Sequence, residues 1–206
     1  MICLSHILFV FQQANEYCLG FESYSYLWLD DRQMYMDQFI TYARQLTMEE
    51  MDLVNLGDSL APKPVAPTMA QYKEQIDTFE SLFAEVEELN SVQVFNSWFQ
   101  VDIRPFKQAL LNTVCKWSYM FKKHLMDHVT NSLFDLSSFI RSADEGLLQT
   151  VEEGDYDKLI SVMGYLMNVK ERQVTTDDMF EPLHDTIELL KQYDQELPEE
   201  VNVLLQ

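Results

Sequence analysis

The sequence predicts an all-α fold, an elongated multi-helix bundle built around one long central helix over about residues 105–142. That stretch contains no glycine and no internal proline, and its apolar residues recur at intervals of three and four. The whole chain has only five Gly and six Pro among 206 residues, which argues against a loop-rich or β-rich fold. A hydrophobic content of 47% provides ample material for a core.

The expected long helix carries a continuous apolar stripe. Its members are Phe106, Leu110, Val114, Trp117, Phe121, Leu125, Val129, Leu133, Leu136 and Ile140. Pro105 suits a first helical turn, and a helix of this length would be about 57 Å long. Because the stripe drifts by about 160° around the helix, different neighbours must cover its two ends, or the helix breaks near Ser137 and Ser138.

The charge balance limits the classes of partner. The formal net charge is −20, with 14 Lys and Arg against 34 Asp and Glu. Nucleic acids and anionic membranes are bound through Lys and Arg, so we expect neither as a partner. Acidic residues spread along all the expected helices are typical of a solvated surface, and attraction to a basic partner is the alternative. Three widely spaced cysteines, Cys3, Cys18 and Cys115, indicate reduced intracellular thiols.

The first part of the chain divides into two segments. Residues 1–13 are an atypical apolar N-terminus, too short to span a bilayer and without signal-peptide features, which fits a buried strand, a helix start or an irregular segment. Residues 14–59 form a helical segment. It contains an N-cap at Asp30 or Asp31, a helix to about Leu46, and a capping box from Thr47 to Glu50 whose helix ends near Gly57. We expect Met34, Phe39, Tyr42 and Leu46 to point inward.

Residues 60–68 contain three prolines within six positions and are interpreted as an extended linker rather than as a PxxP ligand. A helical bundle follows over residues 69–197. A capping box at Thr68 opens a helix with a heptad-like seam, and residues 92–103 form a short extended connection to the long helix. The seam consists of Tyr72, Ile76, Phe79, Phe83 and Val86.

Two further helices are expected after the long one. Asp155 is a good N-cap for a helix of about 17 residues, in which Gly164 would allow a neighbour to approach closely. That helix carries Leu159, Val162, Met163, Leu166 and Met167. Thr175 or Thr176 then opens a helix with Leu183, Ile187 and Leu190 aligned. Residues 198–206 read as the start of another helix, cut from something longer.

No residue pattern predicts catalysis, a cofactor or a metal site. The glycine-rich loops that bind nucleotide phosphates are missing. His124 and His128 have zinc-ligand spacing, but Leu125 stands where a metalloprotease needs Glu, so two surface or half-buried histidines are favoured. Cys115 is interpreted as a small hydrophobe, and the adjacent Glu152 and Glu153 point different ways along a helix. The aromatic residues Tyr17, Phe21, Tyr24, Tyr26 and Trp28 have the helical spacing of core packing rather than of a cage for a cation.

Several segments together resemble the stem of an axonemal dynein heavy chain, most closely the outer-arm beta type. They are EYCLGFESYSYLWLDDRQMYMDQF, VFNSWFQVDIRPFKQALLNTVCKWSYMFKKHL, EEGDYDKLISVMGYLMNVKERQ and TDDMFEPLHDTIELLKQY. The resemblance runs in order over about residues 14–206, and the stretches WFxVDIRPFK and EGDYDxLxxVMG are specific. Residues 1–13 do not match the stem helix expected before them.

The resemblance implies a structural role just before the linker of the motor, with residues 198–206 leading into that linker. The family's ATP sites and microtubule-binding stalk lie C-terminal to this region, so the resemblance implies no enzymatic site, cofactor or nucleotide in the chain. It implies assembly with other dynein heavy and intermediate chains and the rest of the stem, in the cytoplasm and the cytoskeleton of the ciliary axoneme. Two alternatives stay open: a free-standing helical adaptor that binds partner helices, and a metal-dependent enzyme built around His124 and His128.

Overall fold

The computed structural model describes residues 2–196 and 198–199, with side chains from Leu4 onward, and it confirms the all-α class. The helix expected over residues 198–206 falls mostly outside the described residues. The chain divides into two compact units, residues 1–121 and 122–206, which are considered separately. The elements are α1 (Ile2–Leu19), a 3-10 turn (Gly20–Tyr24), α2 (Tyr26–Leu29), α3 (Arg32–Tyr42), α4 (Met48–Leu56), α5 (Met69–Glu88), β1 (Val92–Phe95), β2 (Phe99–Asp102), α6 (Arg104–Leu147) and α7 (Tyr156–Gln192).

Stacked and edge-on aromatic rings form the core of the first unit. Phe79 of α5 stacks on Trp117 of α6, with ring centroids 5.5 Å apart, and also on Phe121, at 6.0 Å. Tyr35 and Phe39 of α3 approach Trp117 and Phe121 edge-on, at 5.1 and 5.3 Å. Such pairs contribute free energy beyond the area that they bury. The seam expected on α5 is therefore confirmed as a core face, although Phe83 is only half-buried.

Polar contacts at helix ends confirm the predicted caps. The Asp31 carboxylate accepts hydrogen bonds from the backbone of Gln33 and Met34, at 2.8 and 3.3 Å. Thr47 and Thr68 both form reciprocal capping boxes with the residue three positions on. The chain then leaves α4 at Gly57, whose φ of 66° is left-handed and suits glycine.

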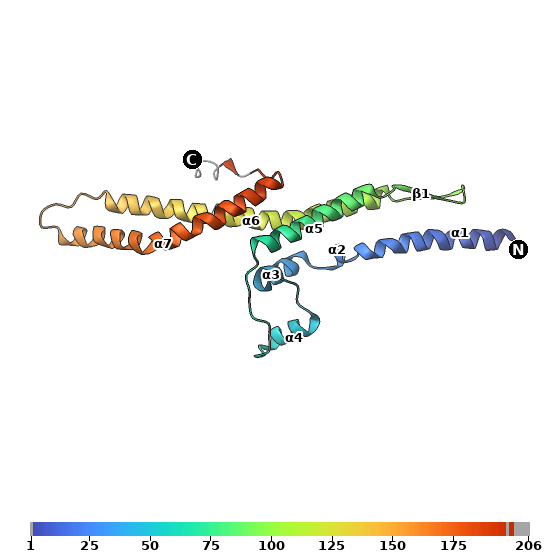
Figure 1. Cartoon of the computed structure of the whole chain (residues 1–206), viewed down its shortest axis with the longest axis horizontal. Helices are drawn as coiled ribbons and strands as arrows, with labels where there is room; N and C mark the ends of the chain where they lie inside the picture. The colour runs from blue at the N-terminus through green and yellow to red at the C-terminus, as the bar shows by residue number, and fades with distance from the viewer. Residues whose placement is uncertain (1, 197, 200–206) are drawn as a thin grey trace. The chain divides into compact units, whose positions relative to one another are not determined.

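An extended connection and a β-hairpin link the helices of the first unit. Between α4 and α5, the prolines of residues 60–68 prevent helix formation, and the Val65 N–H donates to the Thr41 carbonyl at 2.8 Å. The predicted extended stretch between α5 and α6 is an antiparallel hairpin in which Val92 pairs with Asp102. Because this hairpin reverses the chain, α5 and the N-terminal part of α6 run side by side (Figure 1). The Ser118 hydroxyl donates to Glu80 across them at 2.6 Å.

The N-terminal segment is helical rather than extended or irregular. Helix α1 contacts the β-hairpin through Phe11 on Phe99, with centroids 5.0 Å apart, and through Tyr17 on Phe95, at 6.0 Å. Val10 and Ala14 are buried on this side. One apolar face of α1 therefore packs on the hairpin, whereas Leu4, Leu8 and Phe9 lie on other faces of the helix and are exposed.

The long helix α6 is continuous through Ser137 and Ser138, which excludes a break there and leaves the other alternative, that different neighbours cover the two ends of the stripe. All members of the stripe from Leu110 to Leu136 are buried, which confirms it. Ile140 is 56% exposed, contrary to expectation, because the drifting stripe has moved to Ala143, which is buried. Met34 on α3 is also exposed rather than inward, whereas Phe39 is buried as expected.

The second unit is an antiparallel hairpin of the C-terminal part of α6 with α7. The Tyr165 ring lies against Gly146, and the Arg172 guanidinium lies 4.4 Å from the centroid of the Phe139 ring. Farther along, the Lys122 ammonium lies 5.1 Å from the Tyr193 ring centroid. Figure 1 shows the two helices joined by the loop before Asp155, which caps α7 as predicted.

Helix α7 corrects three expectations. It runs unbroken from Tyr156 through Thr175 and Thr176, because threonine can stay inside a helix when its hydroxyl bonds back to the preceding turn, as Thr175 does to the Arg172 carbonyl at 2.9 Å. The predicted packing face is mostly exposed, and only its Val162 is half-buried. Among the described residues outside α7, none lies within 4 Å of a Cβ atom built at Gly164, and the close approach is at Gly146. Leu183, Ile187 and Leu190 are buried as expected.

Replacing Trp117 with Ala should lower the free energy of unfolding by about 3–5 kcal/mol, because it removes the ring at the centre of the aromatic core. The change also removes the indole N–H that donates to the buried Leu27 carbonyl at 2.9 Å. Tyr119→Ala is the matched control, since Tyr119 lies on the same helix but is 53% exposed. Urea unfolding followed by far-UV circular dichroism compares the two variants. Equal losses would contradict the assigned core.

Replacement by Ala should have opposite effects on stability at Gly146 and at Gly164, the two glycines of the α6–α7 hairpin. A Cβ atom at Gly146 would lie 2.5 Å from the Tyr165 ring, so Gly146→Ala should destabilise the second unit by about 1–3 kcal/mol. Gly164 has open space around it, so Gly164→Ala should stabilise α7 by about 0.5–1 kcal/mol. Thermal unfolding of both variants tests this. A stabilising Gly146→Ala would show that α6 and α7 do not approach there.

Candidate functional site

The described part of the chain contains no group of three or more His, Cys, Asp or Glu side chains placed to hold a metal ion. His124 is half-buried and His128 is exposed, one turn apart on α6. Burial, and then the neighbouring His128, lower the pKa of His124, while Asp127 opposes the shift. The Asp127 carboxylate is paired with Lys123 at 2.9 Å. These two histidines therefore lie among charged residues of a helix surface.

The other residues considered for chemistry lie apart from one another. Cys115 is exposed on α6, and Cys18 is exposed on α1. Glu152 and Glu153 lie in the exposed loop before α7. Within residues 2–196 and 198–199, no helix has the length and apolar character needed to cross a bilayer.

The aromatic residues near the start of the chain do not enclose a common cavity. Phe21 and Trp28 both contact Phe106 at the start of α6, with centroids 5.1 and 6.2 Å apart. Tyr24 is buried and donates to Glu85 of α5 at 3.1 Å. Burial, helped by this hydrogen bond, raises the pKa of the Tyr24 phenol. Phe21, Tyr24 and Trp28 join the 3-10 turn and α2 to α5 and α6. Of the five aromatic residues only Tyr24 is buried, and Tyr26 and Trp28 are exposed, so the core interpretation is confirmed only in part.

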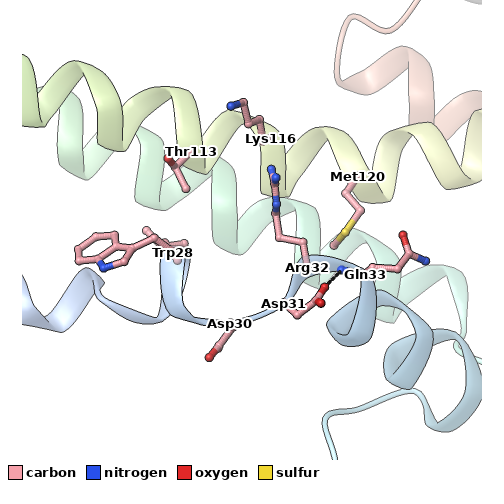
Figure 2. A pocket seen from close by; sticks show the side chains of 9 residues that line it. Trp28, Asp30, Asp31, Arg32, Gln33, Thr113, Lys116 and Met120 are labelled. Carbon is pink, nitrogen blue, oxygen red and sulfur yellow. Dashed lines mark hydrogen bonds between the residues drawn. The ribbon is translucent and has the colours of Figure 1, made fainter.

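An open pocket of about 620 Å³ lies where α2, α3 and α6 meet in the first unit. It is lined by Leu27 and by the eight residues labelled in Figure 2, which are Trp28, Asp30, Asp31, Arg32, Gln33, Thr113, Lys116 and Met120. Two carboxylates and two cations line it, so it favours neither anions nor cations strongly. The Asp31 carboxylate caps α3, and the Thr113 hydroxyl donates to the Ala109 carbonyl. Sequence patterns did not reveal this pocket, because its lining comes from two stretches far apart in the sequence, residues 27–33 and 113–120.

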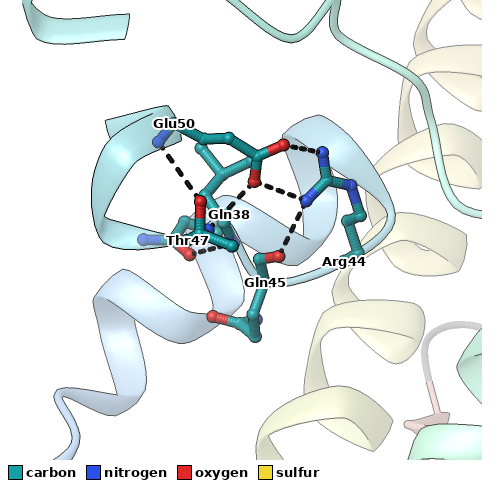
Figure 3. A network of polar contacts seen from close by, with 6 residues as sticks. Gln38, Arg44, Gln45, Thr47 and Glu50 are labelled. Atoms are coloured by element: carbon teal, nitrogen blue, oxygen red, sulfur yellow. Dashed lines mark hydrogen bonds and ion pairs between the residues drawn. The ribbon is translucent and has the colours of Figure 1, made fainter. Parts of the chain in front are cut away.

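A polar network fixes the loop between α3 and α4 (Figure 3). The Arg44 guanidinium donates to both carboxylate oxygens of Glu50, at 2.6 and 2.7 Å, and to the Gln45 carbonyl at 3.2 Å. Glu50 also accepts from the Thr47 N–H at 3.0 Å. The hydrogen bonds from Arg44, and then that from Thr47, lower the pKa of Glu50 from 4.5 to about 2. This arrangement orders a loop and offers no reacting group.

Comparison with known proteins gives a clear relationship in sequence. No family model matches the chain. It is 52% identical over 197 residues to the ciliary dynein beta chain of Tripneustes gratilla, which covers 96% of this chain. It is 50% identical over 202 residues to the human dynein axonemal heavy chain 17, which covers 98%. Similarity extends to the flagellar outer-arm dynein beta chain of Chlamydomonas reinhardtii, at 26% identity over 88% of the chain. The chain spans about 4% of the length of these relatives.

The charge state of Glu50 gives a pH-dependent prediction. Because its pKa in the folded chain is about 2, below the ordinary 4.5, ionised Glu50 should stabilise the loop above about pH 4.5. That contribution should disappear as the pH falls from 4.5 towards 2. Carboxyl carbon shifts measured by NMR should show Glu50 mostly ionised at about pH 3, where an ordinary Glu is mostly protonated. Arg44→Gln should raise this midpoint towards the ordinary value, leaving only the smaller effect of the Thr47 N–H, and Arg32→Gln should not change it; a normal midpoint in the unmodified chain would contradict the network.

Proposed function

Because the chain belongs by sequence to the axonemal dynein heavy chains, we propose that it is a structural segment of a dynein stem. In this role it contributes to dynein assembly and to force transmission in microtubule-based ciliary movement, and it contains no motor site. The observation that carries the proposal is the identity of about half of all residues over 96–98% of the chain.

The long helices support a mechanical role. Helix α6 spans 44 residues, or about 66 Å at 1.5 Å per residue, and its apolar stripe is buried over most of that length. A helix bears load along its axis through continuous backbone hydrogen bonds, and packing on neighbours resists bending. The antiparallel contacts of α6 with α5, and separately with α7, supply such packing.

The sequence supports the part of the proposal that places no motor site in this chain. ATP-driven motors bind phosphates with a glycine-rich loop and a Lys, and none of the five glycines lies in such a motif. Gly57 and Gly154, which have positive φ, lie in a helix end and in a loop before α7, without a neighbouring phosphate-binding motif.

We divide the proposed stem segment at the boundaries that the sequence predicts. Residues 14–59 and 69–197 form its helical parts, residues 60–68 are its proline-rich linker, and residues 198–206 lead towards the motor linker. Its partners are the rest of the stem, other dynein heavy chains and an intermediate chain. It acts in the cytoskeleton of the ciliary axoneme, in keeping with the names of its relatives.

Expression of the tagged chain in ciliated cells tests the assignment. Outer-arm heavy and intermediate chains should co-purify with it from axonemal extracts, as quantified by mass spectrometry. Trp117→Ala, which disrupts the core, should reduce their recovery at least tenfold, whereas Tyr119→Ala should not. Equal recovery with both variants would contradict a folded stem module. ATP hydrolysis by the purified chain above background would contradict the absence of a motor site.

A free-standing helical adaptor is the second candidate. It is favoured by the exposed apolar side chains of α1, among them Leu4 and Leu8, which lie one turn apart. In this case the tagged chain would be found on a partner in cells that make no axonemal dynein. Loss of every partner in such cells would favour the stem.

A further inference from the structure

Helix α7 carries a long apolar face that no other part of the described chain covers. Its members are Tyr156, Leu159, Ile160, Met163, Leu166, Met167 and Val174. At about 100° per residue they fall within an arc of about 120°, over a length of about 27 Å. Each is between 44% and 74% exposed. Lys170 is the one charged residue among them in this arc.

The opposite side of the same helix packs on α6. Tyr165 lies against Gly146, Arg172 lies on the Phe139 ring, and Val162 and Val169 are half-buried. The α6–α7 hairpin is therefore complete without the exposed face. Contiguous apolar side chains on a protein surface are typical of an interaction site.

The same arc continues towards the C-terminal end of α7 as an acidic surface. Asp177, Asp178, Glu181, Asp185 and Glu188 follow the last apolar residue, and all five are exposed. In this described stretch, His184 is the one basic side chain on the arc, and its Nε2 atom lies 3.3 Å from the Glu188 Oε1 atom. One helix face is thus apolar over its first half and negatively charged over its second.

We propose that this face of α7 binds an amphipathic α-helix of another polypeptide, with its apolar stripe on Tyr156–Val174 and a Lys- and Arg-rich end over Asp177–Glu188. An apolar stripe of helical length is the complement of an apolar helix face. The acidic half fixes the direction of the bound helix, because reversal would place its basic end on apolar side chains and leave the carboxylates uncompensated.

Charge argues against a second copy of this chain as the occupant. Parallel pairing of two α7 helices would place one acidic half on the other, and like charges repel. Antiparallel pairing would place each acidic half against an apolar half. The chain as a whole carries a net charge of −20, which adds to the repulsion. The inference rests on α7 alone and holds whether or not the stem assignment is right.

Two synthetic helical peptides of about 33 residues, which match the span from Tyr156 to Glu188, test the proposal. Both carry the same apolar stripe; one has Lys along one end, and the other has Glu at the same positions. Fluorescence anisotropy measures their affinity for the full 206-residue chain. The Lys peptide should bind at least tenfold more tightly than the Glu peptide, and its affinity should fall as salt rises.

Variants locate the binding on α7. Met163→Glu combined with Met167→Glu should weaken the Lys peptide at least tenfold, while Leu4→Glu combined with Leu8→Glu on α1 should leave it unchanged. Asp177→Lys, Asp178→Lys and Glu181→Lys together should reverse the preference in favour of the Glu peptide. All replaced side chains are exposed, and circular dichroism checks that the variants fold.

Three results would overturn the proposal. Absence of Lys-peptide binding would show that α7 has no helix site, and equal affinity for both peptides would show an unspecific apolar surface. Self-association in analytical ultracentrifugation that disappears with Met163→Glu and Met167→Glu would identify a second copy as the occupant.

Discussion

The stacking of Phe79 on Trp117 and Phe121 is the contact on which the first unit depends. These rings bring α5 and α6 together, and Tyr35 and Phe39 attach α3 to the same cluster. The Trp117 indole N–H also holds the carbonyl of Leu27 in α2, so one side chain satisfies a buried polar group and fills the core. These rings therefore connect α2, α3, α5 and α6 in one cluster.

Helix α6 takes part in two antiparallel helix pairs, and local contacts fix the geometry of each pair. In the first unit, the β-hairpin reverses the chain, and the Lys107 ammonium donates to the Glu87 and Leu89 carbonyls at the end of α5, at 2.6 and 2.9 Å. In the second, Gly146 lets the Tyr165 ring reach the backbone of α6. A side chain at Gly146 would occupy the space of that ring, so the glycine decides how closely the helices approach.

In the part of the chain that the structure describes, most charged side chains lie on helix surfaces. Carboxylates such as Asp31 and Asp127 cap helices or pair with nearby cations, Glu80 accepts from a hydroxyl group, and others, such as Asp177, face solvent. The pocket between α2, α3 and α6 mixes both signs of charge. These features agree with the proposed role as a helical segment that contacts other helices, and the chain is related to dynein heavy chains.

The sequence by itself determined the all-α class, most of the helix caps and the buried stripe of α6, because capping residues and apolar spacing act within a few turns. Only the tertiary structure decided which apolar faces are covered. Leu159 and Met163 have the spacing of a core face yet are exposed, because Tyr165 and Arg172 face α6 instead.

Thr175 could cap a helix or lie inside one, and its hydroxyl bonds back within α7. The pocket was likewise beyond prediction from sequence, since Trp28 and Lys116 line it together only after α2 and α6 meet. Periodicity shows that a face is apolar, but burial depends on which neighbour reaches it.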